Sequence, residues 1–256
     1  MSSIALDAAL ADIDTVFNGF ASPDETGCGH CHAPEETAYL RTPYVRIPVD
    51  VVRYYLYEVP DLPHSRLRSS GGTPTDDHAA VMRRLLPQGA RAMADGSLGS
   101  IAYGAHGLTR ADWRSWPAAQ VAAIEAFLYA WWQDALTTPE PPYPIEDIFE
   151  TCVTIARSVT PFLEGWTGGP AADAHLVHLA DVWLYDLLSD ASPFSWWSDD
   201  SEDTGIADLR AWLAGPGAER LRAAGEDDLA LRCEVQTLPE GERWTHPYWS
   251  NPSATN

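Results

Sequence analysis

The chain has 256 residues and a formal charge of −21 at pH 7, from 37 acidic and 16 basic residues. Every basic residue is arginine, which excludes a Schiff-base lysine, the lysine of a phosphate-binding loop and the lysine of a protein kinase. The acidic excess argues against nucleic-acid binding, because contacts with phosphates need clustered cations. Arginine without lysine is typical of a high-GC bacterial genome.

No apolar run reaches the roughly eighteen residues that a membrane helix needs, so we expect no membrane-spanning segment. The N-terminal stretch does not resemble a secretory signal, because it has no basic region and because Asp7 and Asp12 interrupt its apolar positions. We therefore expect a cytoplasmic protein whose four cysteines are reduced. Eleven Trp, ten Tyr and six Phe predict a folded chain.

The first half of the sequence predicts helices separated by loops rich in proline and glycine. Apolar residues recur at helical spacing near the N-terminus, where Asn18-Gly19 supplies a stop signal. The segment 61–75 contains Ser69-Ser70-Gly71-Gly72 and is expected to be a mobile loop. The expected helices cover about residues 4–17, 34–42, 48–59 and 76–94, and a long amphipathic helix includes residues 121–136.

The second half predicts further helices and no strand. They cover about residues 145–158, 160–166, 171–189, 205–214, 216–224 and 226–232. The prolines of 137–144 mark the best boundary between the halves, but the shortness of this segment favours one continuous domain. We therefore predict an all-α protein with a single domain of packed helical hairpins over residues 1–238, an arrangement that suits a solenoid. Residues 239–256 are expected to form a C-terminal tail whose aromatic residues lie back on the surface.

A loop after the first predicted helix holds two cysteines at the spacing of a metal site. Cys28 and Cys31 can bind one tetrahedral metal, and soft thiolate ligands favour zinc. His32, His30 or a distant residue would complete the ligand set, and His78 is the first distant candidate. The other distant candidates are Cys152, Cys233, His64 and His106.

The same loop is compatible with three other readings. The pair could cycle between dithiol and disulfide, although the expected preceding strand is missing. Cys28-Gly29-His30-Cys31-His32 also matches the attachment motif of c-type haem, which is normally formed outside the cytoplasm. The thiols could finally have no chemical role at all.

Other candidate sites favour structural interpretations. His175, His178 and Asp181 could present three ligands on one helix, but Leu176, Leu179, Val182 and Trp183 are expected to form the buried stripe, with the histidines beside it. Glu146 and Glu150 are expected to stabilise a helix N-terminus rather than to act as paired carboxylates. The Trp131-Trp132 and Trp196-Trp197 pairs are expected in the core, with an aromatic ligand pocket as the alternative.

The chain resembles a group of actinobacterial-type, all-helical bacterial proteins that have no established activity. The matching stretches are Cys28-Gly29-His30-Cys31, Asp76-Asp77 with Arg84-Leu85-Leu86, and Trp113-Arg114-Ser115-Trp116-Pro117 leading to Trp131-Trp132. The resemblance implies a helical fold with its site at the cysteine loop. The chain differs from the group at Gly29, where the group has proline, and in its extra His32.

These observations favour an interaction or accessory factor that carries zinc at the cysteine loop and binds another protein. One alternative is a metal-dependent hydrolase or oxidoreductase with an open coordination position, in which His78 or Asp77 would act as an acid or base. A c-type haem protein and a dithiol redox protein are the remaining alternatives.

Overall fold

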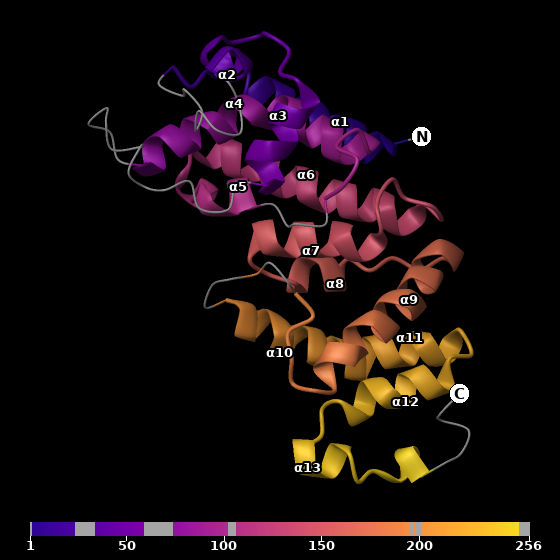
Figure 1. Ribbon diagram of the computed structural model, residues 1–256. Helices are drawn as coiled ribbons and strands as arrows, with labels where there is room; N and C mark the ends of the chain where they lie inside the picture. The colour runs from indigo at the N-terminus through magenta and orange to yellow at the C-terminus, as the bar shows by residue number, and fades with distance from the viewer. Residues whose placement is uncertain are drawn as a thin grey trace. The chain divides into compact units, whose positions relative to one another are not determined.

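The computed structural model describes residues 2–23, 34–58, 74–101, 106–194, 197 and 201–250. Throughout these ranges the chain forms helices and no strand, so the predicted all-α class is confirmed (Figure 1). Among the same residues, no helix combines the length and the apolar character needed to cross a membrane. The cysteine loop and most of the predicted 61–75 loop lie outside the described residues.

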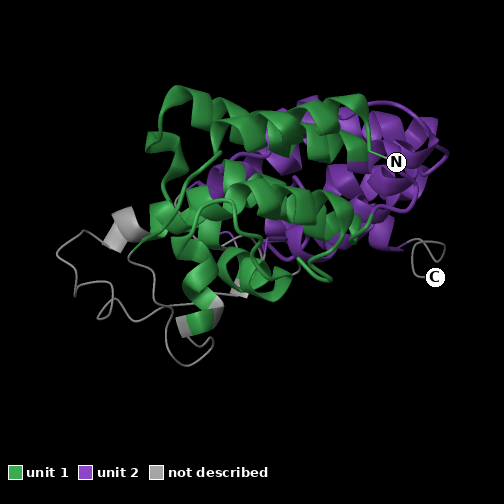
Figure 2. Cartoon of the chain, turned by 90° about the horizontal axis from the view of Figure 1, so that it is seen from above, with its two compact units in different colours: residues 1–134, 142–156 green, residues 135–141, 157–256 purple. Residues whose placement is uncertain are grey.

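Contacts divide the chain into two compact units (Figure 2). Unit 1 contains residues 1–134 and 142–156, and unit 2 contains residues 135–141 and 157–256. The division falls near the proline-rich 137–144 segment that the sequence marks as the best boundary.

The helices of unit 1 are α1 (Ile4–Val16), α2 (Pro34–Arg41), α3 (Val49–Arg53), the π-helix η1 (Tyr54–Glu58), α4 (Pro74–Asp95), α5 (His106–Arg110), the 3₁₀-helix η2 (Trp113–Ser115), α6 (Ala118–Thr137), whose last turn enters unit 2, and α7 (Ile145–Ala156). Unit 2 contains α8 (Thr160–Glu164), α9 (Pro170–Leu187), α10 (Glu202–Trp212), the π-helix η3 (Leu213–Gly217), α11 (Ala218–Ala223), α12 (Asp227–Val235), α13 (Glu240–Arg243) and the 3₁₀-helix η4 (Pro247–Ser250).

Tryptophan side chains build the core of unit 1. Trp131 and Trp132 are buried on α6, where Trp131 stacks on Phe127 with ring centres 5.8 Å apart and Trp132 lies 5.1 Å from Phe149. Trp113 is also buried, and its indole N–H donates to the carbonyl of Ile155 at 3.2 Å. The Trp131-Trp132 pair is therefore part of the core, as the sequence analysis favours.

Polar side chains of α4 fix the segment that joins α2 to α3. The buried guanidinium of Arg84 donates to the carbonyls of Tyr39, Thr42 and Val45. Burial lowers the pKa of Arg84. One turn further along α4, the Gln88 amide pairs with both backbone groups of Ile47. These contacts hold the segment after α2 against α4.

In unit 2, α9 packs against α11 and α12. Its buried side includes Leu176, Leu179 and Trp183, as expected, but two details of the prediction are wrong. Val182 is 41% exposed, and His175 is buried. The buried face of α9 is therefore rotated toward Leu184 and Leu187, both of which lie in the core.

Candidate functional site

The predicted metal loop, with Cys28, His30, Cys31 and His32, lies outside the described residues. The chain on either side of it is described. The Ser22 N–H donates to the Leu40 carbonyl at 2.9 Å, and α1 and α2 both pack on α4. A backbone hydrogen bond therefore joins the chain before the loop to α2, which follows it, and a metal would not be needed to bring these two segments together.

His78, the first distant ligand candidate, lies on α4 and is half-buried. Its Nε2 lies 2.6 Å from the carbonyl oxygen of Gly107, at hydrogen-bond distance. An Nε2–H that donates to a carbonyl leaves Nδ1 as the only ring atom able to ligate a metal. Metal-bound histidines commonly use their second ring nitrogen in this way, so this contact is compatible with the predicted role.

The two other described cysteines are poor candidates for metal or redox chemistry. Cys152 and Cys233 are free and fully buried. Burial raises the pKa of the Cys233 thiol to about 12 and also raises that of Cys152. The thiolate is the metal-binding and nucleophilic form, so these thiols behave as core residues. The side chains of His64 and His106 lie outside the described part.

The helical His175, His178 and Asp181 motif is not assembled as a metal site. His175 Nε2 lies 2.9 Å from the Thr138 carbonyl, whereas the Asp181 carboxylate binds Arg232 at 3.1 Å. Nowhere in the described ranges do three or more His, Cys, Asp or Glu side chains come together as a metal site would require. Glu146 lies in the first turn of α7, where an acid favours the helix dipole as expected.

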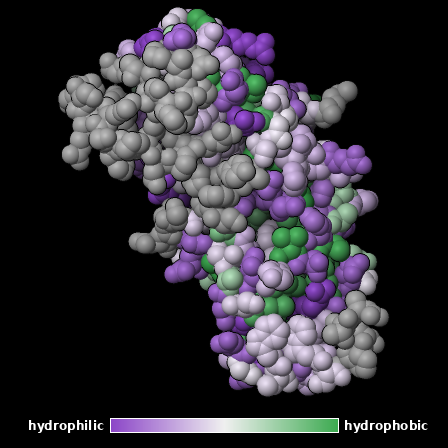
Figure 3. All heavy atoms as spheres, in the orientation of Figure 1, coloured by the Kyte–Doolittle hydropathy of each residue, from purple (hydrophilic) through white to green (hydrophobic). Residues whose placement is uncertain are grey.

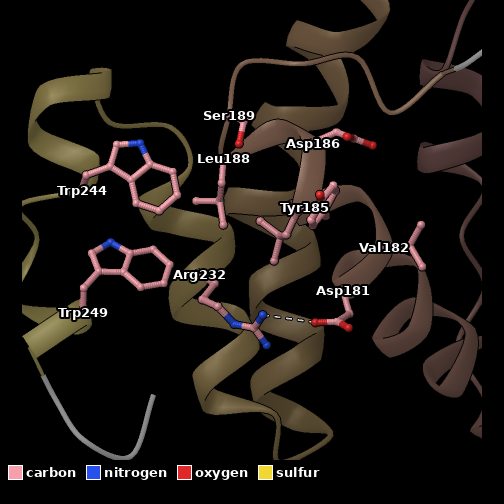
Figure 4. Close-up of a pocket in the computed structure, with 10 residues that line it drawn as sticks. Asp181, Val182, Tyr185, Asp186, Leu188, Ser189, Arg232, Trp244 and Trp249 are labelled. Atoms are coloured by element: carbon pink, nitrogen blue, oxygen red, sulfur yellow. Dashed lines mark hydrogen bonds and ion pairs between the residues drawn. The ribbon is translucent and has the colours of Figure 1, made fainter. Parts of the chain in front are cut away.

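An open groove in unit 2 is the feature that the sequence did not reveal. Its volume is about 690 Å³. Side chains between residues 181 and 189, at the C-terminal end of α9 and just after it, line the groove together with Arg232, Trp244 and Trp249 (Figure 4). In the close-up the two indoles lie on one side of Leu188 and Tyr185, and Asp186 lies on the opposite side.

The exposed apolar side chains of unit 2 gather in this groove. Tyr185 is 82% exposed, Trp244 49% and Val182 41%, and all three line the groove. Among the described residues of unit 2, these three are also the complete set of large exposed hydrophobic side chains. In the space-filling view, green and pale residues adjoin purple ones over the region of α9 to α13 (Figure 3).

Buried polar contacts hold the tryptophan pair in place. The Trp249 indole donates to the Arg243 carbonyl at 2.8 Å and packs against Trp244 in a tilted arrangement with ring centres 5.3 Å apart. Arg243 is itself 3% exposed and donates to the carbonyls of Leu188 and Leu238. The segment expected to be a tail thus contains two short helices, α13 and η4, and supplies one wall of the groove.

The charges of the groove are of two kinds. Arg232 is bound between Asp181, at 3.1 Å, and Asp228, at 3.2 Å. Asp228 also accepts a hydrogen bond from the Tyr248 hydroxyl at 3.0 Å. The pKa of Tyr248 is raised, chiefly by burial and also by this hydrogen bond. By contrast, the Asp186 carboxylate makes no hydrogen bond or ion pair with any described residue. The groove therefore presents one unneutralised carboxylate beside exposed aromatic rings.

No protein-family model matches the chain, and no curated protein or solved structure is significantly similar to it.

Proposed function

We propose that the protein is an interaction or accessory factor that binds a partner protein in the groove of Tyr185 and Trp244. The observation that carries the proposal is the gathering of the exposed apolar side chains of unit 2 in one groove. Scattered exposed apolar residues are normal on a protein surface, whereas a contiguous group beside polar residues is typical of an interaction site.

The residue types support a protein partner. Tyrosine and tryptophan are enriched among the residues that dominate binding energy at protein interfaces. Each buries roughly 150–250 Å² when covered and can still hydrogen-bond through its polar atom. The Trp249 ring is already held by Arg243, so binding would not have to immobilise it.

Zinc at the cysteine loop is the second part of the proposal. Cys28, Cys31 and His32 or His30 would supply the nearby ligands, and His78 would supply a distant one. A closed four-ligand site would act structurally in a cytoplasmic interaction factor. Three protein ligands and a water molecule would instead favour the metal-dependent enzyme alternative.

Site-specific crosslinking tests the docking role. Tyr185 is replaced by the photoreactive residue p-benzoylphenylalanine, and cells of the native host that express the variant are irradiated. The matched control places the same residue at Tyr129, an exposed tyrosine of unit 1. We expect one discrete crosslinked protein from position 185 and none from position 129. Absence of an adduct at 185, or the same set of adducts at both positions, would refute the docking role.

A further inference from the structure

The groove joins an aromatic wall to an anionic end. Trp244 and Trp249 form the wall on one side of Leu188, and the exposed Tyr185 and its neighbour Asp186 lie on the other side (Figure 4). An occupant that covers the whole groove must therefore offer apolar atoms to the indoles and a hydrogen-bond donor to the carboxylate. A purely apolar occupant would bury the Asp186 charge without a partner, which is unfavourable.

The charge of the surrounding unit favours a positively charged donor. Unit 2 contains 18 Asp and Glu but only six Arg, a net charge of −12. Five of these arginines, namely Arg210, Arg220, Arg222, Arg232 and Arg243, are held by carboxylates of the same unit. The field around the groove is therefore negative, and it attracts cations and repels anions.

Resting on the proposed docking function, we propose that the occupant is an arginine-bearing segment of the partner protein. Its guanidinium stacks on the Tyr185 ring and donates hydrogen bonds to the Asp186 carboxylate. Neighbouring apolar side chains of the segment contact Trp244 and Leu188. This arrangement satisfies the aromatic wall and the anionic end at the same time.

Arginine fits this site better than lysine. A planar guanidinium can stack on an aromatic ring while its N–H groups bind a carboxylate, whereas a lysine ammonium is strongly hydrated and cannot stack. Guanidinium groups also lie over aromatic rings within the chain, with Arg83 at 4.2 Å from the Trp116 ring centre and Arg114 at 4.4 Å from that of Trp113.

A second copy of this chain is a poor occupant. Each copy carries a formal charge of −21, so two copies repel each other. The positive partner expected here must come from a different protein, one with an exposed arginine beside apolar residues.

Binding of defined peptides tests the proposal. Three fluorescein-labelled peptides share an alanine and leucine sequence and differ only at spaced positions that hold arginine, lysine or the uncharged isostere citrulline. Fluorescence anisotropy measures their dissociation constants. We expect the arginine peptide to bind best, the lysine peptide about threefold more weakly and the citrulline peptide at least about tenfold more weakly. High salt should weaken binding of the arginine peptide several-fold.

Two variants localise the effect. Asp186→Asn should weaken the arginine peptide about three- to fivefold and leave the citrulline peptide unchanged. Tyr185→Leu keeps an apolar side chain but removes the ring, so it should abolish the preference for arginine over lysine. Glu164→Gln is the matched control, because it removes one exposed carboxylate from the same unit outside the groove. Thermal melting checks that each variant remains folded.

Failure of this proposal and failure of the docking role are distinguishable. If position 185 crosslinks a partner but the arginine and citrulline peptides bind equally, the groove docks an apolar segment and the arginine assignment is wrong. An equal loss of affinity for the arginine peptide in Asp186→Asn and Glu164→Gln would show that only the overall charge of the protein matters. That result would also overturn the assignment. Failure of both crosslinking and peptide binding would overturn the docking role itself.

Discussion

The Arg243 guanidinium lies 3.0 Å from the carboxylate of Asp190, which lies three residues after the end of α9 and has a left-handed backbone (φ 55°). The same guanidinium donates to the Leu188 carbonyl at 2.5 Å and to the Leu238 carbonyl at 3.0 Å. One buried arginine therefore connects the end of α9 to the segment that carries Trp244 and Trp249. The geometry of the groove depends on this connection.

Arg243→Met should destabilise the protein. It leaves two carbonyls and part of a carboxylate without a donor in a site where the arginine is 3% exposed. We expect the free energy of unfolding to fall by about 2–3 kcal/mol, measured by urea denaturation. Arg222→Met is the control, because Arg222 forms a solvent-exposed pair with Glu234 and its loss should change stability far less than the loss of Arg243. Equal losses in the two variants would contradict the structural role of Arg243.

Asp190 should make stability depend on pH in the acid range. The hydrogen bond from Arg243 holds the pKa of its carboxyl below the ordinary value of 3.8. The unfolded chain therefore binds the proton more readily than the folded one, so the stabilisation is present above about pH 4 and is lost as the pH falls through the folded pKa. Asn also tolerates the left-handed backbone, so Asp190→Asn removes the charge alone.

Urea denaturation of the wild type and of Asp190→Asn at several pH values measures this effect. The wild type should be more stable than the variant at about pH 6, and the difference should shrink as the pH falls below about 4. A difference that is independent of pH would show that the carboxylate charge makes no contribution to stability.

Gly107 permits the close approach of two helices in unit 1. A Cβ atom at this position would lie 2.0 Å from the Tyr55 carbonyl oxygen, a backbone atom that cannot rotate away. Gly107→Ala should therefore cost more than about 3 kcal/mol of unfolding free energy, or prevent folding. Gly241→Ala meets no atom within 4 Å and should change stability by no more than about 0.5 kcal/mol. A small loss in Gly107→Ala would show that α5 can move away from η1.

Patterns of apolar residues predicted most helices because burial imposes its periodicity on the sequence. The two π-helices were not predictable in this way. The sequence suggests separate helices on either side of Gly215-Pro216, but the chain stays helical from Glu202 to Ala223. The π-turn η3 widens the helix at Pro216, where a regular α-helix would lose a hydrogen bond and clash with the preceding turn.

The groove depends on contacts that no local pattern contains. Tyr185 and Trp244 are far apart in sequence, and they line the same groove because the contact between Arg243 and Asp190 holds the α13 segment against the end of α9. The one local signal is Val182-x-x-Tyr185, two large apolar residues on the outer face of α9. Assigning Val182 to the buried stripe concealed this signal. The cysteine loop remains a prediction from sequence.

Thr151 carries a buried hydroxyl to which the described part of the chain offers no partner in hydrogen-bond geometry. Its Oγ1 and the Tyr57 hydroxyl lie near each other, but among the described residues neither has a partner with hydrogen-bond geometry. Thr151→Val replaces the hydroxyl with a methyl group of similar size, so we expect unfolding free energy to stay the same or to rise by up to about 1 kcal/mol.

Tyr143→Phe supplies the contrast for this prediction. The Tyr143 hydroxyl donates to the Ala92 carbonyl at 2.9 Å and accepts from the Leu98 N–H at 3.3 Å. Its removal should cost about 1–2 kcal/mol in the same urea experiment. A loss of that size in Thr151→Val would instead reveal a partner for Oγ1, such as a buried water molecule.

Cys28→Ser should lower both the zinc content and the melting temperature. Protein purified without chelator or a metal-binding tag should contain about one zinc per chain, and the variant should lose it. Because Ser22, Leu40 and Arg84 already hold the loop ends, we expect the melting temperature to fall by only about 2–4 °C.

Cys233→Ser is the control for the zinc experiment. This residue is fully buried outside the loop, so its replacement should lower the melting temperature while the zinc content stays the same. Unchanged zinc content and unchanged melting in Cys28→Ser would refute the metal site. All the alternatives use the same two sulfur atoms, so their signatures distinguish them. Metal-free protein with two titratable loop thiols would favour a redox dithiol or an inert pair. A Soret absorption band would favour haem.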